Sequence, residues 1–384
     1  MQFHTNTKCA RRTGWVTSEL YYWHDTQNYC GFFEPSMTVQ PGMHFENPET
    51  KRRFHGLVEA LDLAPHLHAL RPHSASDESI RMVHPQSHID HIAKVCASGG
   101  GDFGEMTPGG PATLDIARLA VGGVIDAVDK VVAGEWDNAY VLCRPPGHHA
   151  EPEWSRGFCI FANAALGVKH AQQAHGIKRV ATIDWDVHHG NGSETIFYDD
   201  PSVLTISLHQ NRLYPPDSGD YTDTGRDGGE GANLNIPLPP GSGSGAYRTA
   251  FEELVIPALE AFKPEMIFVP SGFDSCALDP LGMQMLASGD YAWMTARLME
   301  VADKHAKGRI IMTHEGGYSA VYVPYCGLAT LEALSGADTT FEDPFAAIVA
   351  AYGGQELSGD QKQVIDNVKK SFFKTVRSTV ESET

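Results

Sequence analysis

The segment Arg179-Val-Ala-Thr-Ile-Asp-Trp-Asp-Val-His-His-Gly-Asn-Gly192 passes from an apolar, β-branched run into a series of polar and ionisable residues. Its first part, Arg179–Ile183, is typical of a buried strand. Its second part begins at Asp184, where the strand is predicted to end. A helical pattern over Ala162–His175 precedes the strand. This unit of helix, strand and polar loop decides the fold because it recurs along the chain.

The same unit occurs before and after this segment. Apolar runs predict four further strands, at Ala139–Cys143, Val203–Leu208, Met266–Pro270 and Arg309–Thr313. Periodic apolar patterns predict further helices, at Ala112–Ala133, Tyr247–Phe262 and Tyr291–Lys307. Alternation of this kind predicts an α/β fold, with a parallel sheet that is covered by helices on both faces.

The two ends of the chain depart from this alternation. The region from residue 1 to about residue 110 reads as irregular, apart from a helix predicted over Asn47–Leu63. The Gly-rich segment Ser98–Gly110 predicts a long surface loop. Ser358–Val380 predicts a helix of mixed charge that packs on the outside or at a subunit contact. Because no internal repeat or low-complexity linker is present, we expect one domain over residues 1–384.

Composition excludes several classes of function. Among 384 residues, 29 are Lys or Arg and 48 are Asp or Glu, a net charge of −19. This charge repels nucleic acid and anionic membranes; it suits a cationic substrate, although solubility explains it equally well. We see neither a signal peptide nor an apolar run of about 18 residues. The seven cysteines form no Cys-x-x-Cys pair, which predicts reduced thiols in a cytoplasmic protein.

Every predicted strand is followed by residues that carry chemistry. The sequences at the strand ends are Arg144-Pro-Pro-Gly-His148-His149, Asp184-Trp-Asp186-Val-His188-His189-Gly-Asn191-Gly192, His209, Ser271-Gly-Phe-Asp274 and His314-Glu-Gly-Gly-Tyr318. In open parallel sheets, ligands bind outside the carboxyl ends of the strands. We therefore expect these side chains to meet at one edge of the sheet.

Three of these residues form a candidate metal site. Asp186 and His188 are two residues apart in an extended segment, so both side chains point the same way. Asp274, from another strand end, supplies a third ligand. Three nitrogen and oxygen ligands with an open position are typical of catalytic zinc. An isolated Asp-x-His is more often part of a surface loop, so the metal interpretation depends on Asp274.

The tandem histidines and a tyrosine complete the candidate site. A rigid Pro-Pro-Gly turn fixes the directions of His148 and His149, one of which can take a proton from water while Asp184 partners the other. Tyr318 follows a Gly-Gly turn that we expect to be flexible, so that its hydroxyl can swing towards an oxyanion. The alternatives are a pair of capped loop histidines and a core tyrosine.

With these motifs in view, the chain resembles the zinc-dependent histone deacetylases, especially the bacterial histone deacetylase-like amidohydrolases close to class II. The resemblance spans about Asn47 to Tyr325, and five motifs occur in the family's order. They are Arg-Pro-Pro-Gly-His-His, Asp-Trp-Asp-Val-His-His-Gly-Asn-Gly, Ser-Leu-His, Ser-Gly-Phe-Asp with Asp-Pro-Leu-Gly, and Glu-Gly-Gly-Tyr. It implies the arginase–deacetylase fold, with an eight-stranded, mainly parallel sheet.

The resemblance also implies roles for individual residues. Asp186, His188 and Asp274 look like the zinc ligands, and His149 resembles the general base. His148, paired with Asp184, resembles its electrostatic neighbour, and Tyr318 resembles the phenol that polarises the scissile carbonyl. The implied substrate channel is lined by Gly157, Phe158, Tyr214 and Leu281. A structural potassium ion is implied near Asp184, Asp186, His188, Ser207 and Leu208.

Three positions depart from patterns found among relatives. Asn191 stands where class I members carry an aspartate beside the second histidine; class II members share the Asn, and His149 should be less basic for it. Cys276 stands where arginase-type relatives carry a carboxylate for a second metal, so we expect one metal. Tyr214 replaces the usual Phe and makes the channel wall slightly more polar.

These observations predict zinc-dependent hydrolysis of acyl-lysine, typically acetyl-lysine, or of related acylated amines, with release of a carboxylate and a free amine. An acetylpolyamine deacetylase is the main alternative, which Leu281 disfavours because some such relatives carry a Glu there. A non-catalytic acyl-lysine reader and an arginase-like ureohydrolase are weaker alternatives. The long N-terminal loops predict a homo-oligomer. Cys159 and Cys276 lie near site residues in the sequence, and we expect buried, inert thiols.

Overall fold

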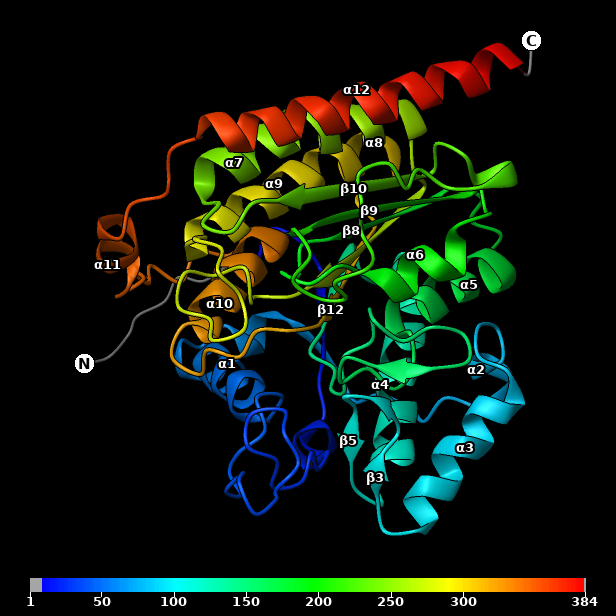
Figure 1. Ribbon diagram of the computed structural model, residues 1–384, viewed down its shortest axis with the longest axis vertical. Coiled ribbons are helices and arrows are strands. Elements are labelled where there is room, and N and C mark those ends of the chain that lie inside the picture. The colour runs from blue at the N-terminus through cyan, green and yellow to red at the C-terminus, as the bar shows by residue number, and fades with distance from the viewer. Residues whose placement is uncertain (1–8, 383–384) are drawn as a thin grey trace.

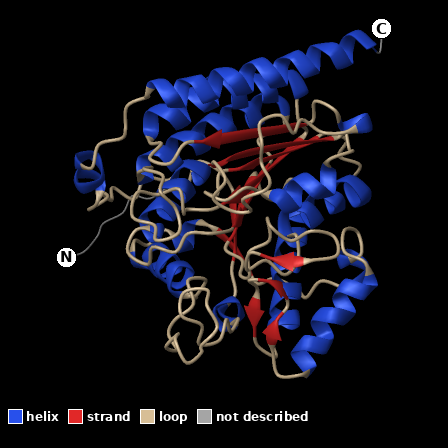
Figure 2. Cartoon of the chain, in the orientation of Figure 1, coloured by secondary structure: helices blue, strands red, loops and turns tan. Residues whose placement is uncertain are grey.

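The computed structural model describes residues 9–382, with side chains to Thr375, and is built around one eight-stranded sheet in which every pairing is parallel. Its order is β10-β9-β8-β11-β12-β6-β1-β2. Figure 2 shows the strands in red among the blue helices. The bounds are β1 Thr13–Val16, β2 His68–Leu70, β6 Asn138–Val141, β8 Val180–Asp184, β9 Val203–Gln210, β10 Asn233–Leu238, β11 Met266–Ser271 and β12 Ile310–His314. The predicted α/β fold is confirmed, and the five predicted strands are neighbours within the sheet.

The described part of the chain contains twelve α-helices. Their bounds are α1 Glu49–Ala60, α2 Asp77–Ile80, α3 Gln86–Ala97, α4 Thr113–Val132, α5 Asn163–His175, α6 Asn191–Phe197, α7 Ser244–Ala250, α8 Ile256–Phe262, α9 Ser288–His305, α10 Val323–Ser335, α11 Ala346–Ala351 and α12 Gly359–Ser382. Most of them lie on the two faces of the sheet, whereas α2, α3 and α11 lie away from it (Figure 1). None of the helices within residues 9–382 combines the length and apolarity needed to cross a membrane.

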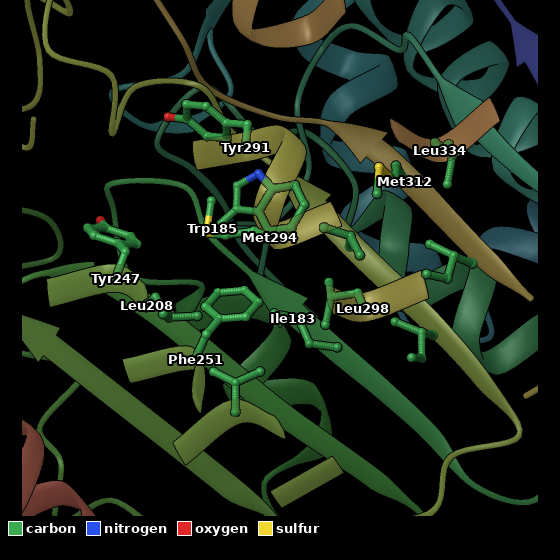
Figure 3. Packing of buried hydrophobic residues seen from close by; sticks show 14 of the residues in the cluster. Ile183, Trp185, Leu208, Tyr247, Phe251, Tyr291, Met294, Leu298, Met312 and Leu334 are labelled. Atoms are coloured by element: carbon green, nitrogen blue, oxygen red, sulfur yellow. The ribbon is translucent and has the colours of Figure 1, made fainter. Parts of the chain in front are cut away.

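Alternation along the strands creates a separate core on each face of the sheet. On β6 and just beyond it, Tyr140 and Leu142 belong to one buried cluster, whereas Ala139 and Val141 belong to another. Helices α4 and α5 cover the second cluster, and helices α7 to α10 pack over the first. Figure 3 shows part of the first cluster, with Trp185 among the side chains beneath these helices. Because helices cover both faces of the sheet, a ligand can reach the sheet only at the ends of its strands.

The expectation of an irregular N-terminal region is wrong in part. Strands β1 and β2 and helix α3 all lie before residue 110. Strand β1 has four residues including Gly14, and β2 has three residues that are largely exposed. Segments this short give no periodic signal. Strand β1 is held by pairing with β6, and β2 by pairing with β1. Strand β10 was missed because Asn233 and Asn235 make it look polar.

The Gly-rich segment Ser98–Gly110 is not only a surface loop. It contains β3 Gly101–Asp102, β4 Gly104–Glu105 and β5 Pro108–Gly109. Strand β4 pairs with β7, Ser155–Arg156, so that Glu105 lies beside Arg156. This pairing brings residues before α4 to the loop that follows β6, which a local pattern cannot predict.

The predicted helix Tyr247–Phe262 begins three residues earlier and is interrupted. A π-helical turn, η4 Phe251–Val255, separates α7 from α8. Pro257, two residues after the end of this turn, has no backbone N–H to donate to the carbonyl of Glu253. The loss of that hydrogen bond explains why the helix widens at this point.

The C-terminal helix α12 lies across α7, η4 and β10 on the outside of the molecule (Figure 1). Ile365, Val368 and Phe372 are buried against this core. The predicted outer packing of this helix is confirmed.

A buried ion cluster ties the N-terminal region to the loop after β6. The Arg144 Nε lies 2.8 Å from Glu46 Oε1, and the Lys51 Nζ lies 3.1 Å from the same oxygen. All three side chains are at most 1% exposed. Burial alone would raise the pKa of Glu46, but the charges of Arg144 and Lys51 outweigh burial and hold that pKa well below its usual range.

Replacing Glu46 by glutamine should lower the free energy of unfolding at pH 7 by about 3–5 kcal/mol, because two buried cations lose their carboxylate. A depressed folded-state pKa stabilises the protein above the ordinary value of 4.5, and this stabilisation is lost as pH falls towards the folded value. Urea unfolding should therefore show a constant difference from wild type between pH 8 and pH 5, and a smaller difference at pH 4. A difference below about 1 kcal/mol at pH 7 would contradict this account.

Candidate active site

The strand ends converge on a narrow cavity at the carboxyl edge of the sheet. Its volume is about 210 Å³, and it is lined by Phe32, Met106, His149, Gly157, Phe158, His188, Leu213, Tyr214, Leu281 and Tyr318. The four residues predicted to line a channel are therefore in the cavity wall, together with three of the predicted reactive residues. Phe32, Met106 and Leu213 were missed because they lie in irregular segments without a spacing signal.

At the end of this cavity, Asp186, His188 and Asp274 form a buried cluster. Their potential ligand atoms all lie within 4.8 Å of one another. His188 Nδ1 is 2.9 Å from Asp186 Oδ1 and 3.2 Å from Asp274 Oδ2. Asp274 Oδ2 is buried but accepts no hydrogen bond from any group in the described part of the chain. An unsatisfied carboxylate oxygen that faces an imidazole nitrogen and a second carboxylate fits a divalent cation.

Gly272 and Gly316 have no side chain, and this leaves room for the carboxylates of the cluster. A Cβ atom on Gly272 would lie 2.1 Å from Asp186 Oδ2, and one on Gly316 would lie 2.1 Å from Asp274 Oδ2. Any side chain at either position would displace a carboxylate. The motifs Ser-Gly-Phe-Asp and Glu-Gly-Gly-Tyr thus contain glycine for close approach of the backbone to the cluster.

Electrostatics also favour a cation at this cluster. Burial alone would lower the pKa of His188, but the neighbouring carboxylates of Asp186 and Asp274 outweigh it and raise the pKa to about 10. Burial and the charge of Asp186 raise the pKa of Asp274 to about 6. The cluster thus holds more negative charge than one imidazolium neutralises, which a divalent ion would balance.

Two other clusters in the described residues have suitable ligand types but fit a catalytic metal less well. In the first, Glu315 already accepts hydrogen bonds from the backbone of Gly147 and His148, and Cys159 donates to Gly157 O. In the second, the half-exposed Asp129 pairs with two histidines through one oxygen; these are His170 at 2.7 Å and His175 at 2.6 Å. Its residues do not line the cavity.

The tandem histidines have different partners. His148 Nδ1 is 2.9 Å from Asp184 Oδ2, and His149 Nδ1 is 2.7 Å from Asn191 Oδ1. Burial would lower the pKa of His148, but Asp186 and Asp184 outweigh it and raise that pKa to about 10. Burial, with the positive charge of His148 as the next cause, holds the pKa of His149 well below its usual value. One ring is therefore set to be charged and its neighbour to be neutral.

Two carboxylates, the buried Glu315 and the partly buried Asp279, accept backbone hydrogen bonds that fix the loops carrying these groups. Glu315 Oε2 accepts from the N–H of Gly147 at 2.6 Å and of His148 at 3.1 Å. Asp279 Oδ2 accepts from the N–H of Tyr318 at 2.7 Å and of Ser319 at 3.2 Å. Both carboxylates stand in the quoted motifs or directly after them, but the sequence did not show that they hold the backbone.

The turn before Tyr318 is therefore anchored, and the expectation of a flexible turn is wrong. Besides the bonds to Asp279, the N–H of Gly316 donates to Asp186 Oδ2 at 2.8 Å. Gly317 has a φ of +119°, a conformation that requires glycine. Gly316 allows the backbone to approach the carboxylates closely, and Gly317 supplies the backbone conformation that the turn needs. The hydrogen bonds to Asp186 and Asp279 fix the position of the backbone at Tyr318.

The cavity wall includes two consecutive residues with left-handed backbone. Gly157 has a φ of +55° and Phe158 a φ of +69°. Positive φ is costly for a bulky residue and is usually maintained where function needs it. Here it directs the Phe158 ring into the cavity, where its centroid is 5.9 Å from that of Tyr318. On another part of the wall, the Tyr214 hydroxyl donates to Glu105 Oε1 at 3.3 Å.

Replacing Gly157 by alanine should lower kcat/KM by about 10²-fold, because displaced reacting groups cost about that much. The new Cβ would lie 2.4 Å from His149 Cδ2 and 2.8 Å from Tyr214 Cε1. Left-handed alanine should also lower the free energy of unfolding by about 1–2 kcal/mol. Gly134→Ala is the matched control, since Gly134 has a φ of +71° and open space around it. If both variants lost stability and neither lost activity, the close contact with His149 would be unimportant.

The remaining predicted residues lie beside the cluster. The register of the sheet pairs Asp184 of β8 with Ser207 of β9, and Leu208 is the next residue. Cys159 and Cys276 are buried, and burial raises the pKa of both thiols. Buried thiols with raised pKa are poor nucleophiles, as expected for inert cysteines.

The fold and the site define an α/β protein of the arginase–deacetylase architecture, with a candidate metal centre at the floor of an apolar cavity. Within that class, the chain belongs to the histone deacetylase family, because residues 44–334 match the Histone deacetylase domain. It is 46% identical over 338 residues to a histone deacetylase-like amidohydrolase of Pseudomonas aeruginosa, covering 87% of this chain and 89% of the relative.

Two further relatives agree with this assignment. A probable deacetylase of Archaeoglobus fulgidus is 40% identical over 271 residues, which is 70% of this chain and 74% of the relative. The crystal structure of the HDA15 HD domain superimposes with a TM-score of 0.83 at 29% identity and covers 97% of each chain. The family supports an enzyme with deacetylase or amidohydrolase activity.

Proposed function

We propose that this protein is a zinc-dependent deacylase that hydrolyses the amide bond of acetyl-lysine or of a related acylated amine. One observation carries the proposal. The cavity is mostly apolar along its walls, and His149, His188 and Tyr318 all contribute to its lining. An extended acylated side chain can therefore bring its amide to a metal centre, a base and a hydrogen-bond donor at once.

In this proposal, Asp186, His188 and Asp274 hold the zinc ion. When bound there, zinc would supply a Lewis acid for the acyl carbonyl and would lower the pKa of a water molecule, to about 7 in well-studied sites. The orphaned Asp274 Oδ2 and the orientation of His188 Nδ1 towards both carboxylates support this ligand set. Cys276, which is buried, replaces the carboxylate that a second metal would need, so one metal is expected.

His149 acts as the general base and then as the general acid. Its Nδ1 faces Asn191, so Nε2 is the nitrogen left to accept the proton of the attacking water and to return it to the departing amine. The low pKa of His149 keeps it neutral before the reaction. His148, held by Asp184, supplies a fixed positive charge beside it.

Tyr318 donates a hydrogen bond to the carbonyl oxygen as negative charge develops there. Burial, followed by the charges of Asp274 and Asp186, raises the pKa of Tyr318 well above its usual value. The phenol therefore keeps its proton at neutral pH. Its backbone is held by Asp279, so the donor is in place before substrate binds.

The walls of the cavity favour an acylated lysine over an acetylpolyamine. Phe158 and Leu281 offer apolar surface to a methylene chain and no charge to a second amine. Glu105, the nearest acid on the Tyr214 side, is already paired with Arg156 at 3.0 Å.

The test compares hydrolysis of a fluorogenic acetyl-lysine amide with that of acetylputrescine. We expect a higher kcat/KM for the lysine substrate, loss of activity with a chelator, and recovery with zinc. Activity that persists in the metal-free protein would refute the zinc proposal. A higher kcat/KM for acetylputrescine would replace the proposed substrate class by the polyamines.

We also propose the structural potassium ion near Asp184, Asp186, His188, Ser207 and Leu208. The pairing of Asp184 with Ser207 supports it, because hard alkali cations prefer oxygen ligands and this pairing gathers side-chain and backbone oxygens. Thermal unfolding in potassium chloride and in tetramethylammonium chloride tests it, and equal midpoints would refute it.

A further inference from the structure

Asn191 lies between the proposed base and a carboxylate that the mechanism above does not use. Its Oδ1 is 2.7 Å from His149 Nδ1, and its Nδ2 donates to Glu151 Oε1 at 2.7 Å. Glu151 is two residues after His149 in the sequence. Among the described residues, its carboxylate makes no hydrogen bond to the His149 imidazole. It reaches the base only through the amide of Asn191.

The two ends of an amide are chemically different, and this difference matters for His149. The Nδ2 group only donates hydrogen bonds, whereas Oδ1 only accepts them. An ionised carboxylate only accepts, so Glu151 can pair with the Nδ2 end alone. Rotating the amide by half a turn would bring Oδ1 against the Glu151 oxygens and leave two acceptors facing each other. Glu151 therefore favours one of the two orientations of Asn191, and the backbone carbonyl of His149, which accepts from the same Nδ2 at the longer distance of 3.4 Å, favours it as well.

That orientation determines which nitrogen of His149 carries the proton. With Oδ1 facing the ring, Nδ1 must be the N–H donor in the neutral imidazole, and Nε2 has the free lone pair. In the rotated amide, Nδ2 would donate to Nδ1, and the proton would move to Nε2. A histidine protonated at Nε2 cannot take a proton from water on the cavity side.

Glu151 is itself held in place. Arg156 Nη1 lies 3.0 Å from Glu151 Oε1, and Arg156 Nη2 lies 3.0 Å from Glu105 Oε2. The pairing of β4 with β7 sets Glu105 beside Arg156. The Glu151 side chain is 24% exposed, and Asn191 is buried. The Arg156 guanidinium thus fixes the Glu151 carboxylate against the Asn191 amide, and the pairing of β4 with β7 fixes Arg156 beside Glu105.

We propose that Glu151 is a positioning residue for the reaction: it orients the Asn191 amide so that His149 holds its proton on Nδ1 and presents an unprotonated Nε2 to the substrate. This inference rests on the proposed role of His149 as the base. It explains how an uncharged Asn can serve where class I relatives carry an aspartate, because a carboxylate is an acceptor in either orientation, whereas an amide must be oriented.

The test is a double-mutant cycle in the full-length, zinc-loaded protein. Glu151→Ala should lower kcat by about 10–100-fold, as loss of an outer hydrogen-bond partner typically does, with KM nearly unchanged. Glu151→Gln should retain most of the activity, because its carbonyl still accepts from Asn191 Nδ2. Glu153→Gln, an exposed residue two positions further on, is the matched control and should behave as wild type.

The decisive comparison is made in an Asn191→Asp background. The carboxylate introduced by this substitution accepts from His149 Nδ1 in either orientation, so adding Glu151→Ala should cause no further loss. Removing Glu151 there should even raise kcat, since two carboxylates would otherwise face each other. If Glu151→Ala lowered kcat by the same factor in both backgrounds, its role would be structural and the proposal would be overturned.

A second measurement does not depend on turnover. Long-range ¹H–¹⁵N spectra of protein labelled with ¹⁵N-histidine, with His149→Ala used to assign the signals, report the tautomer of His149. We expect the Nδ1–H form in wild type and in Glu151→Gln, and a shift towards the Nε2–H form in Glu151→Ala. An unchanged tautomer in Glu151→Ala would overturn the inference. A protein that binds zinc and shows these tautomers but does not hydrolyse the amide would refute the proposed function alone.

Discussion

Replacing Asp274 by asparagine should leave the protein folded, without its metal and without measurable amide hydrolysis. Asp274 Oδ1 accepts from the N–H of Val187 at 2.8 Å, and an asparagine carbonyl can keep this bond. Oδ2 is the buried oxygen that accepts no hydrogen bond and lies 3.2 Å from His188 Nδ1. In the variant, an NH₂ group would take its place and turn two hydrogen atoms towards the cation.

The expected loss of metal affinity exceeds the 10–100-fold or so that loss of an outer hydrogen-bond partner costs, because a ligand itself is removed. Zinc content by elemental analysis and kcat/KM on an acetyl-lysine amide measure the two effects. Asp129→Asn is the matched control, since Asp129 pairs with histidines, as Asp274 pairs with His188, but lies away from the cavity. Stoichiometric zinc or near-normal turnover in Asp274→Asn would remove the basis of the proposed mechanism.

Tyr318→Phe should lower kcat by about 10²–10³-fold, the usual cost of losing one donor to an oxyanion, while zinc stays bound. The substitution deletes only the hydroxyl. The phenyl ring keeps its contact with Phe158 and its position 5.9 Å from Lys51 Nζ, and its backbone stays bound to Asp279. A loss of activity would therefore report on the donor and not on the fold.

The pH dependence offers an independent check on Tyr318. Because its pKa is raised well above the usual value of about 10, the phenol keeps its proton throughout the working range, and no decline in kcat/KM below about pH 10 should come from this group. Tyr352→Phe, at an exposed position, is the control. Wild-type turnover in Tyr318→Phe, or a profile that loses its alkaline limb in that variant, would contradict the assigned role.

Much of the fold was predictable from the sequence because its signals are local. The run Arg179–Ile183 and its four counterparts are apolar over the length of a strand, and helical patterns separate most of them. Parallel strands place their carboxyl ends at one edge, so the polar residues after each strand had to meet. Asp186, His188 and Asp274 could be assembled into one candidate site on this ground alone.

Other features depend on contacts between distant parts of the chain. Strand β1 exists because it pairs with both β2 and β6, and Phe32 reaches the cavity from a segment without regular structure. Glu315 holds the N–H of Gly147, which is 168 residues away. A hydrogen bond between a side chain and a remote backbone group leaves no spacing or periodicity in the sequence.

The sequence by itself thus determined the class of the sheet, the positions of its five central strands along the chain and which chemical groups stand at their ends. Only the tertiary structure decided the spatial order of the strands and how those groups are oriented, through Asp279 at Tyr318, Glu315 at His148 and Glu151 at Asn191. The physical reason is that apolar patterning acts over a few residues, whereas the direction of a reactive side chain is set by hydrogen bonds that form only after the chain has packed.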